Sequence, residues 1–233
     1  MKYTIIFALL GAMTLSFCFV VEGAASRAVA IFVAVDFFAY SMMYAVRQPQ
    51  IFLKRRNGSI HLMSYLIFAP LHLLNWLSLF VAIQFAKERP HDKVLPNLLL
   101  GRRLLPNEAF VLARQGELAV LDLTCEFAEN KRLRGLDYLC LPVLDHTAPT
   151  KQQITEALVF VEERVHRKVV FVHCALGHGR SATMVAAWLL SRKLTPDVRT
   201  AIAQLQSTRR GVKLETGQKR VLEEMFPGTG TDK

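Results

Sequence analysis

Three long apolar segments occupy the first part of the chain. Uncharged runs extend from Tyr3 to Val21 and from Leu62 to Ala86, and the run from Ala28 to Val46 contains one charged residue, Asp36. A helix needs about 20 mainly apolar residues to cross the hydrocarbon core of a bilayer. The pattern therefore predicts an α-helical membrane region at residues 1–93 with two or three hydrophobic helices.

The first apolar segment has an alternative interpretation as a cleaved signal peptide, with Lys2 as its basic start and Ala24–Ala25 near the cleavage site. However, its apolar run is longer than the roughly 7–15 residues of a signal-peptide core, and a second apolar segment follows directly. We therefore expect uncleaved anchors.

The third apolar segment carries Pro70, His72 and Asn75 near its middle. A proline inside a helix removes a hydrogen bond and bends the axis. If this segment enters and returns, nearly all flanking Lys and Arg residues lie on one side and Arg27 lies alone on the other, as the positive-inside rule favours. We expect two crossings of the inner (plasma) membrane, a broken or interfacial third segment, and a cytoplasmic C-terminal domain. Three straight crossings remain the alternative.

The pattern changes after residue 93, where short apolar strands alternate with amphipathic helices. Charged residues and prolines crowd into Lys87–Pro96, as is typical of a linker, so we expect a second domain at residues 94–233. The predicted strands are Leu118–Thr124, Tyr138–Val143 and Lys168–His173; the predicted helices run from Thr150 to about His166, from Arg180 to Arg192, from Thr195 onward and from Thr216 to Phe226. This alternation predicts an α/β fold with a mainly parallel sheet flanked by helices, and places function at the carboxyl ends of the strands.

Composition excludes several classes of protein. The chain is 52% hydrophobic and 21% charged, which excludes a disordered or collagen-like chain. The net charge of +10 is divided evenly between the two predicted parts. No basic helix or aromatic-studded strand accompanies the charge, so we expect membrane lipids rather than nucleic acid as partners.

The four cysteines, Cys18, Cys125, Cys140 and Cys174, form no CxxC pair. A disulfide framework or a zinc site is therefore disfavoured, and no metal or cofactor is expected. Of the four cysteines, only Cys174 lies within a motif that indicates a reactive thiol.

That motif is His-Cys-Ala-Leu-Gly-His-Gly-Arg-Ser, at residues 173–181, between a predicted buried strand and a predicted helix. The loop between Cys174 and Arg180 can turn its backbone N–H groups inward as an anion-binding nest at a helix N-terminus. Arg180 can hold two phosphate oxygens at once, and the same positive field favours the thiolate of Cys174. Ser181 is placed to donate a hydrogen bond to the sulfur when it becomes a leaving group. The loop residues expected to bind phosphate are Ala175, Leu176, Gly177, His178 and Gly179.

A thiolate that attacks phosphorus needs a proton donor for the departing oxygen. Asp145 follows a predicted strand in the loop Leu-Asp-His-Thr-Ala-Pro and lies at the same edge of the sheet. One carboxyl group there can protonate the leaving group and then activate water. Asp122, within its strand, is interpreted as a strand-end residue whose hydrogen bonds are satisfied.

These residues resemble the cysteine-based protein tyrosine phosphatases, in particular the dual-specificity branch, over about residues 96–227. The resemblance implies Cys174 as nucleophile, Arg180 as phosphate ligand, Asp145 as general acid and Ser181 as helper. Thr208–Leu214 followed by Gln218 is similar to the late segment that shapes the pocket, so Gln218 either positions water or caps a helix. The run from Leu121 to Thr124 with Glu126-Phe127 resembles bacterial members joined to membrane segments.

Two departures from the family pattern bear on the substrate. The phosphate loop lacks the lysines typical of enzymes for highly phosphorylated inositol lipids, and no further segment before residue 96 is evident for gripping phosphotyrosine. The resemblance therefore implies a shallow, permissive pocket. His178 either contacts substrate or faces solvent.

We therefore predict a membrane-anchored, cysteine-dependent phosphatase that hydrolyses phosphotyrosine, phosphoserine or phosphothreonine in proteins. One alternative is a phosphatase for a phospholipid phosphomonoester such as phosphatidylglycerophosphate, and another is a non-catalytic phosphate-binding module, against which the joint presence of Cys174, Asp145 and Arg180 argues. Sulfurtransferase and arsenate reductase activities also start from a loop cysteine, but neither requires Asp145. The oligomeric state is left open.

Overall fold

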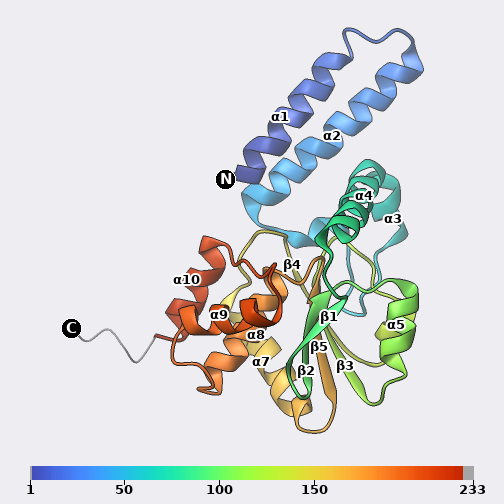
Figure 1. Ribbon diagram of the computed structural model, residues 1–233. Coiled ribbons are helices and arrows are strands. Elements are labelled where there is room, and N and C mark those ends of the chain that lie inside the picture. Colours follow the sequence, from blue (N-terminus) through green and yellow to red (C-terminus); the bar gives the residue numbers. More distant parts are fainter. Residues whose placement is uncertain (1, 228–233) are drawn as a thin grey trace, which may run out of the picture.

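The computed structural model describes residues 2–227. Met1 and the end of the predicted second domain, residues 228–233, lie outside the described residues. An α/β domain forms the body of the molecule, and a helical hairpin of α1 (Lys2–Phe17) and α2 (Ala24–Val46) projects from one end of it (Figure 1). This confirms the predicted α/β fold preceded by a helical region.

The central sheet has five strands in the order β1-β2-β5-β3-β4, with β1 antiparallel to β2 and the remaining pairs parallel. The strands are β1 (His91–Leu95), β2 (Leu98–Arg102), β3 (Leu118–Thr124), β4 (Asp137–Val143) and β5 (Val169–Cys174). The interior strands β2 and β3 are buried along their whole length and β5 over most of its length, as the apolar run of β5 predicts. β2 was not among the predicted strands. The expected linker instead contains β1, and a boundary after residue 93 falls inside this strand.

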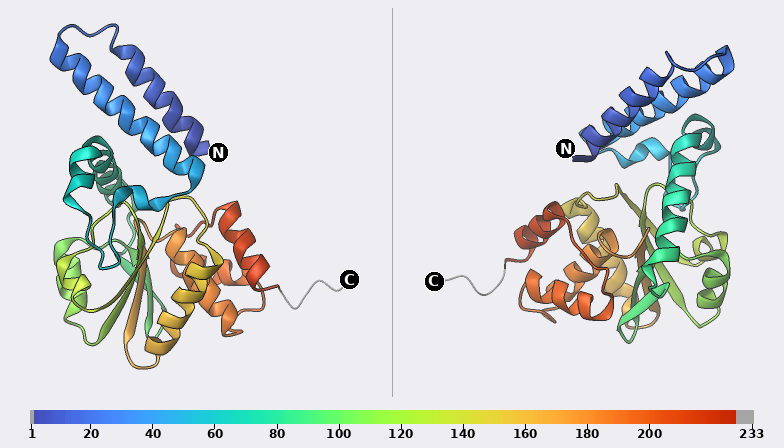
Figure 2. Two further views of the ribbon diagram at one scale, coloured as in Figure 1. Left: turned by 180° about the vertical axis from the view of Figure 1, so that it is seen from behind. Right: turned by 45° about the horizontal axis from the view of Figure 1, so that its top comes forward.

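Helices cover both faces of the sheet (Figure 2). On one face lie α7 (Lys151–Val165), α8 (Arg180–Ser191), α9 (Val198–Thr208) and α10 (Thr216–Met225), and on the other lie α5 (Pro106–Ala113) and α6 (Lys131–Arg134). Thr150 and Gln153 form the predicted capping box of α7. The prediction that a helix starts at Thr195 is wrong: Asp197 is the N-cap of α9, and its side chain accepts a hydrogen bond from the N–H of Thr200 at 2.7 Å.

The N-terminal helices are α1 (Lys2–Phe17), α2 (Ala24–Val46), α3 (Leu62–Ile67) and α4 (Ala69–Ala86), with the short helix η1 (Pro49–Phe52) after α2. The third apolar segment is broken at Phe68, and Pro70 lies in the first turn of α4, where its missing N–H leaves no helical hydrogen bond unmade. By length and composition, α2 and α4 are suited to cross a membrane, whereas α1 is shorter.

These helices pack directly on the α/β domain. Tyr40, Met43, Phe52 and Leu71 share one apolar cluster with Cys125 and Leu144 of the domain. The Trp76 ring of α4 contacts Phe127 with 5.2 Å between ring centroids, and the guanidinium of Arg103 lies over the same indole. The predicted membrane region and the α/β domain are therefore held together by shared packing as well as by the chain that connects them.

Candidate active site

The predicted phosphate loop connects the end of β5 to the start of α8. The Cys174 sulfur accepts a hydrogen bond from the N–H of Gly177 at 3.3 Å and lies 3.3 Å from the Ser181 hydroxyl. Gly177 has a φ of 79°, and a Cβ there would lie 2.6 Å from the backbone of Gly101. Only glycine fits this position, because both the positive φ and the close approach exclude a side chain. The loop therefore curls around the sulfur as its sequence indicates.

The Arg180 side chain is fully buried, and its guanidinium is held by carboxylates. It donates to both oxygens of Glu126 at 2.7 and 2.9 Å and to the carbonyl of Val143 at 2.9 Å. Burial alone would lower the pKa of Arg180, but the Asp145 and Glu126 carboxylates raise it. Its Nε–H finds no acceptor within residues 2–227 and is free to donate to an anion. Glu126, for which the sequence predicts no role, orients the predicted phosphate ligand.

Asp145 lies in the loop after β4, beside the arginine. One of its oxygens is 3.1 Å from the Arg180 guanidinium, and its side chain is about half exposed. Burial would raise the pKa of Asp145, but Arg180 and His146 hold it below its usual value. A phosphate dianion bound to Arg180 would replace this carboxylate as its partner and would favour the protonated acid that a leaving oxygen requires.

Asp145→Asn is expected to slow hydrolysis of alkyl phosphates by about 10²–10⁴-fold and of aryl phosphates with good leaving groups by less than about tenfold, because only a poor leaving group needs the proton. In the parent protein, alkyl phosphate turnover should fall as the pH rises through the pKa of Asp145, and this decline should vanish in the variant. Steady-state kinetics on both substrates measure both effects. Equal losses on the two substrates would exclude Asp145 as the proton donor.

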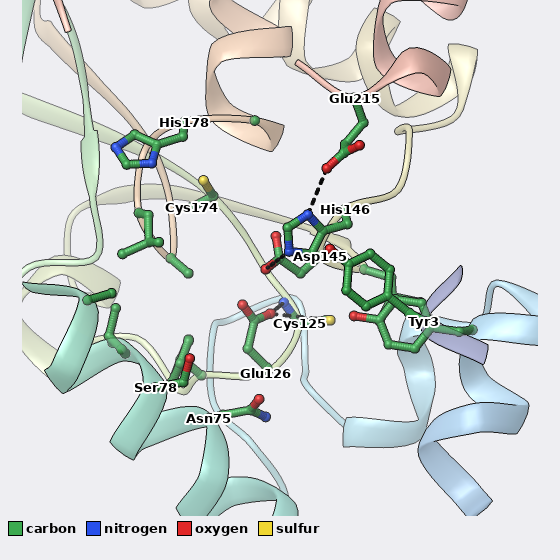
Figure 3. Close-up of a pocket in the computed structure, with 18 of the residues that line it drawn as sticks. Tyr3, Asn75, Ser78, Cys125, Glu126, Asp145, His146, Cys174, His178 and Glu215 are labelled. Carbon is green, nitrogen blue, oxygen red and sulfur yellow. Dashed lines mark hydrogen bonds and ion pairs between the residues drawn. The ribbon is translucent and has the colours of Figure 1, made fainter. Parts of the chain in front are cut away.

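The loop that carries Asp145 is braced from two directions (Figure 3). His146 bonds Glu215 at 2.9 Å and stacks on the Tyr3 ring of α1, with 4.5 Å between ring centroids. Gln218 is buried and donates to the carbonyl of Thr147 at 2.9 Å, while its carbonyl oxygen accepts from the N–H of Glu215. Gln218 is thus a helix cap, one of its two expected roles, and it also supports the acid loop.

His178 of the phosphate loop lines the pocket, so its contact with substrate stays a prediction. Its ring nitrogen also lies 2.6 Å from Glu88, two residues after α4. Glu88 also pairs with Arg209 at 3.0 Å and accepts from the N–H of Gly211 at 2.8 Å. The end of α4 is therefore connected to the phosphate loop by charged hydrogen bonds.

A pocket of about 730 Å³ opens above the Cys174 sulfur. One side consists of the loops that carry Glu126, Asp145 and the phosphate motif. The other side consists of residues from the N-terminal helices: Lys2, Tyr3, Phe7, Tyr40, Tyr44, Leu74, Asn75, Ser78, Leu79 and Ala82. The expectation that no segment before residue 96 contributes to the pocket is wrong, because residues of α1, α2 and α4 line it.

A second cluster of charged groups is buried beneath the loop. The Lys54 ammonium donates to Asp122 at 2.6 Å and to Thr124 at 2.7 Å, and Tyr138 donates to Asp122 at 2.7 Å. Burial would raise the pKa of Asp122, but Lys54 holds it well below its usual range. Asp122 is thus a satisfied strand-end residue, as expected, with a partner that the sequence did not indicate.

The same cluster includes His173 and Glu129, whose side chains approach to 3.1 Å. Burial would lower the pKa of His173, but the carboxylates of Glu129 and Asp122 raise it. Asp122, Glu129 and His173 have the composition of a metal site. The Lys54 ammonium already bonds Asp122, so a positive charge of the protein itself balances these carboxylates.

Comparisons with known proteins agree with this geometry. The family described as "Dual specificity phosphatase, catalytic domain" matches residues 111–226. The human phosphatidylglycerophosphatase and protein-tyrosine phosphatase 1 is 33% identical over 147 residues, which are 58% of this chain and 72% of the relative. The phosphatidylglycerophosphate phosphatase PTPMT2 of Arabidopsis thaliana is 34% identical over 91 residues, and the match spans 38% of this chain and 40% of the relative.

Among solved structures, that of Tk-PTP in the active form aligns with a TM-score of 0.54 at 29% identity, over 59% of this chain and 97% of that one. About two fifths of this chain therefore lies outside the alignment.

Proposed function

Because the chain belongs to the dual-specificity phosphatase family, we propose that it is a cysteine-dependent phosphomonoester phosphatase anchored in a membrane, and that its substrate is a phospholipid phosphomonoester. The observation that carries the proposal is the pocket above Cys174, since the phosphate loop forms one side and apolar helices form the other.

In the first half-reaction, the Cys174 thiolate attacks phosphorus and forms an S–P bond while the bond from phosphorus to the leaving oxygen breaks. Asp145 gives its proton to that oxygen, and Arg180, oriented by Glu126, holds the phosphoryl oxygens. In the second, the Asp145 carboxylate takes a proton from water as the water oxygen attacks phosphorus. The S–P bond breaks, and Ser181 donates a hydrogen bond to the returning thiolate.

The wall opposite the phosphate loop supports a lipid substrate. Phe7, Leu74 and Leu79 line it, and they belong to helices that expose many large apolar side chains to their surroundings. A lipid whose phosphate enters the loop would keep its chains beside these helices without leaving an apolar environment. The names of the human and plant relatives, both of which refer to phosphatidylglycerophosphate, support the same class of substrate.

Phosphorylated protein is the second candidate. The name of the human relative also includes protein-tyrosine phosphatase. The pocket rim opposite α4 carries the polar residues Lys213 and Glu215, both exposed, which a peptide chain could contact from the aqueous side.

For the membrane arrangement, we propose that α1 and α2 cross the inner (plasma) membrane as a hairpin and that α3 and α4 lie at its cytoplasmic surface. α2 has 23 residues and spans about 35 Å, enough for the hydrocarbon core. α4 lies along the α/β domain, as the contact between Trp76 and Phe127 indicates. Protease accessibility in intact and opened membranes tests the orientation.

The substrate class is tested with the full chain purified in detergent and supplied with phosphatidylglycerophosphate, phosphatidic acid, and phosphotyrosine, phosphoserine and phosphothreonine peptides. Release of inorganic phosphate is measured, with Cys174→Ser as the blank. We expect kcat/KM for at least one lipid to exceed that for every peptide. If the protein hydrolysed only the phosphopeptides, phosphorylated protein would replace phospholipid as the proposed substrate.

A further inference from the structure

The α4 side of the pocket carries polar residues in a helix that is otherwise mainly apolar. Asn75 and Ser78 are three positions apart and therefore lie on one face of α4, and both line the pocket. Of the other polar residues in α4, His72 is paired with Ser64 at 3.0 Å, and Gln84 is exposed near the helix end.

Asn75 is held in one orientation by α2. The Tyr40 hydroxyl donates to the Asn75 carbonyl oxygen at 3.1 Å, and Tyr40 itself is buried. The amide nitrogen of Asn75 is also buried, and it donates to no acceptor among the residues that the structure describes. A buried donor without an acceptor is unfavourable, so this nitrogen is suited to a ligand that brings one.

Glu126, a charged acceptor that lines the same pocket, is already engaged by other donors. Both oxygens of Glu126 bind Arg180, and one of them also accepts from the N–H of Cys125. Figure 3 shows Asn75 and Ser78 on α4 across the pocket from Asp145 and Cys174. A molecule whose phosphate lies at Cys174 would therefore extend past these two side chains before it reaches the apolar helices.

We propose that Asn75, oriented by Tyr40 and assisted by Ser78, forms a second binding subsite for oxygen acceptors of the glycerol backbone of a phospholipid phosphomonoester. This inference rests on the proposed function. The phosphate binds in the loop at residues 174–180, the glycerol oxygens accept from the Asn75 amide and the Ser78 hydroxyl, and the acyl chains continue beside Phe7 and Leu79, which line the same pocket.

The subsite predicts selectivity between two lipids that share a phosphate and a long chain. Phosphatidic acid carries glycerol ester oxygens, whereas dodecyl phosphate carries none. The readout is the ratio of kcat/KM for phosphatidic acid to kcat/KM for dodecyl phosphate, both in mixed micelles with the full chain. Asn75→Leu should lower this ratio about tenfold, the effect of one lost hydrogen bond to the substrate. Tyr40→Phe should lower the ratio less, because the Asn75 amide remains but loses the hydrogen bond from Tyr40 that orients it.

Gln84→Leu is the matched control, since it makes the same change in the same helix at an exposed position outside the pocket; it should leave the ratio unchanged. If the ratio in Asn75→Leu equals that of the parent protein, the proposed subsite is wrong, whereas the proposed activity on lipids still stands. Equal losses on both lipids also overturn it, because they indicate a structural defect. A parent protein that hydrolyses only phosphopeptides overturns the proposed function itself, and the subsite with it.

Discussion

Cys174→Ser is expected to abolish phosphatase activity, with a loss of about 10⁴-fold or more in kcat, the scale seen when an enzyme loses its nucleophile. The serine hydroxyl stays protonated at neutral pH and is a weak nucleophile unless a base activates it. Among the described residues, the side chain that contacts the Cys174 sulfur is the Ser181 hydroxyl at 3.3 Å, and a hydroxyl does not serve as such a base. Phosphate release from an aryl phosphate measures the loss.

Binding should survive this substitution. The Gly177 N–H and Arg180 remain in place, so inorganic phosphate or vanadate should still bind and raise the thermal midpoint of the variant. Cys140→Ser is the matched control, because Cys140 is buried in β4 away from the pocket and burial raises the pKa of its thiol to about 12. Retained turnover in Cys174→Ser, or an equal loss in the control, would contradict a cysteinyl-phosphate mechanism.

The residues that could be predicted from the sequence are those whose roles are local. The turn from β5 to α8 places Cys174, Gly177 and Arg180 within a few residues of one another, so that spacing alone predicts an anion nest. β3 was predicted to the residue, because an apolar run buried on both faces leaves little choice of structure. β1 was missed because its sequence, HDKVL, has the mixed polarity of a half-exposed edge strand.

The residues that could not be predicted act across long sequence separations. Glu126 binds Arg180 from 54 positions away, and Glu88 reaches His178 across 90 positions. Each is an ordinary charged residue in its own segment, and nothing nearby distinguishes it from a solvated one. The same holds for the pocket wall: Tyr3, Tyr40 and Asn75 belong to segments that are apolar on every side, so periodicity cannot separate the residues that line the pocket from those that face away from it.

Lys54→Met is expected to lower the free energy of unfolding by about 3–5 kcal/mol, because it removes one partner of a buried ion pair and leaves the other charged. Both side chains of the pair are nearly inaccessible to solvent, at 1% and 0% exposure. The effect reaches the active site, since Asp122 lies in β3 beside His173, the residue before Cys174. The variant should lose several degrees of thermal midpoint when unfolding is followed in detergent.

Acid should weaken the parent protein more than the variant. Lys54 depresses the pKa of Asp122, so the pair stabilises the fold above the pKa of an unfolded aspartate, about 3.9, and this contribution is lost as the pH falls toward the folded value. Without Lys54 there is little such contribution to lose. The slope of stability against pH on the acid side should therefore be shallower in Lys54→Met.

Arg56→Met is the matched control for Lys54→Met, because Arg56 lies two positions away, is 82% exposed and forms only a surface pair with Glu156 at 3.9 Å. It should change stability by less than about 1 kcal/mol. Adding Asp122→Asn to Lys54→Met should recover part of the loss by removing the unpaired charge. If Lys54→Met were no worse than Arg56→Met, the buried pair of Lys54 and Asp122 would not stabilise the fold. If it is much worse, an isolated fragment of residues 94–233 should be unstable, since it lacks the lysine that neutralises its own core.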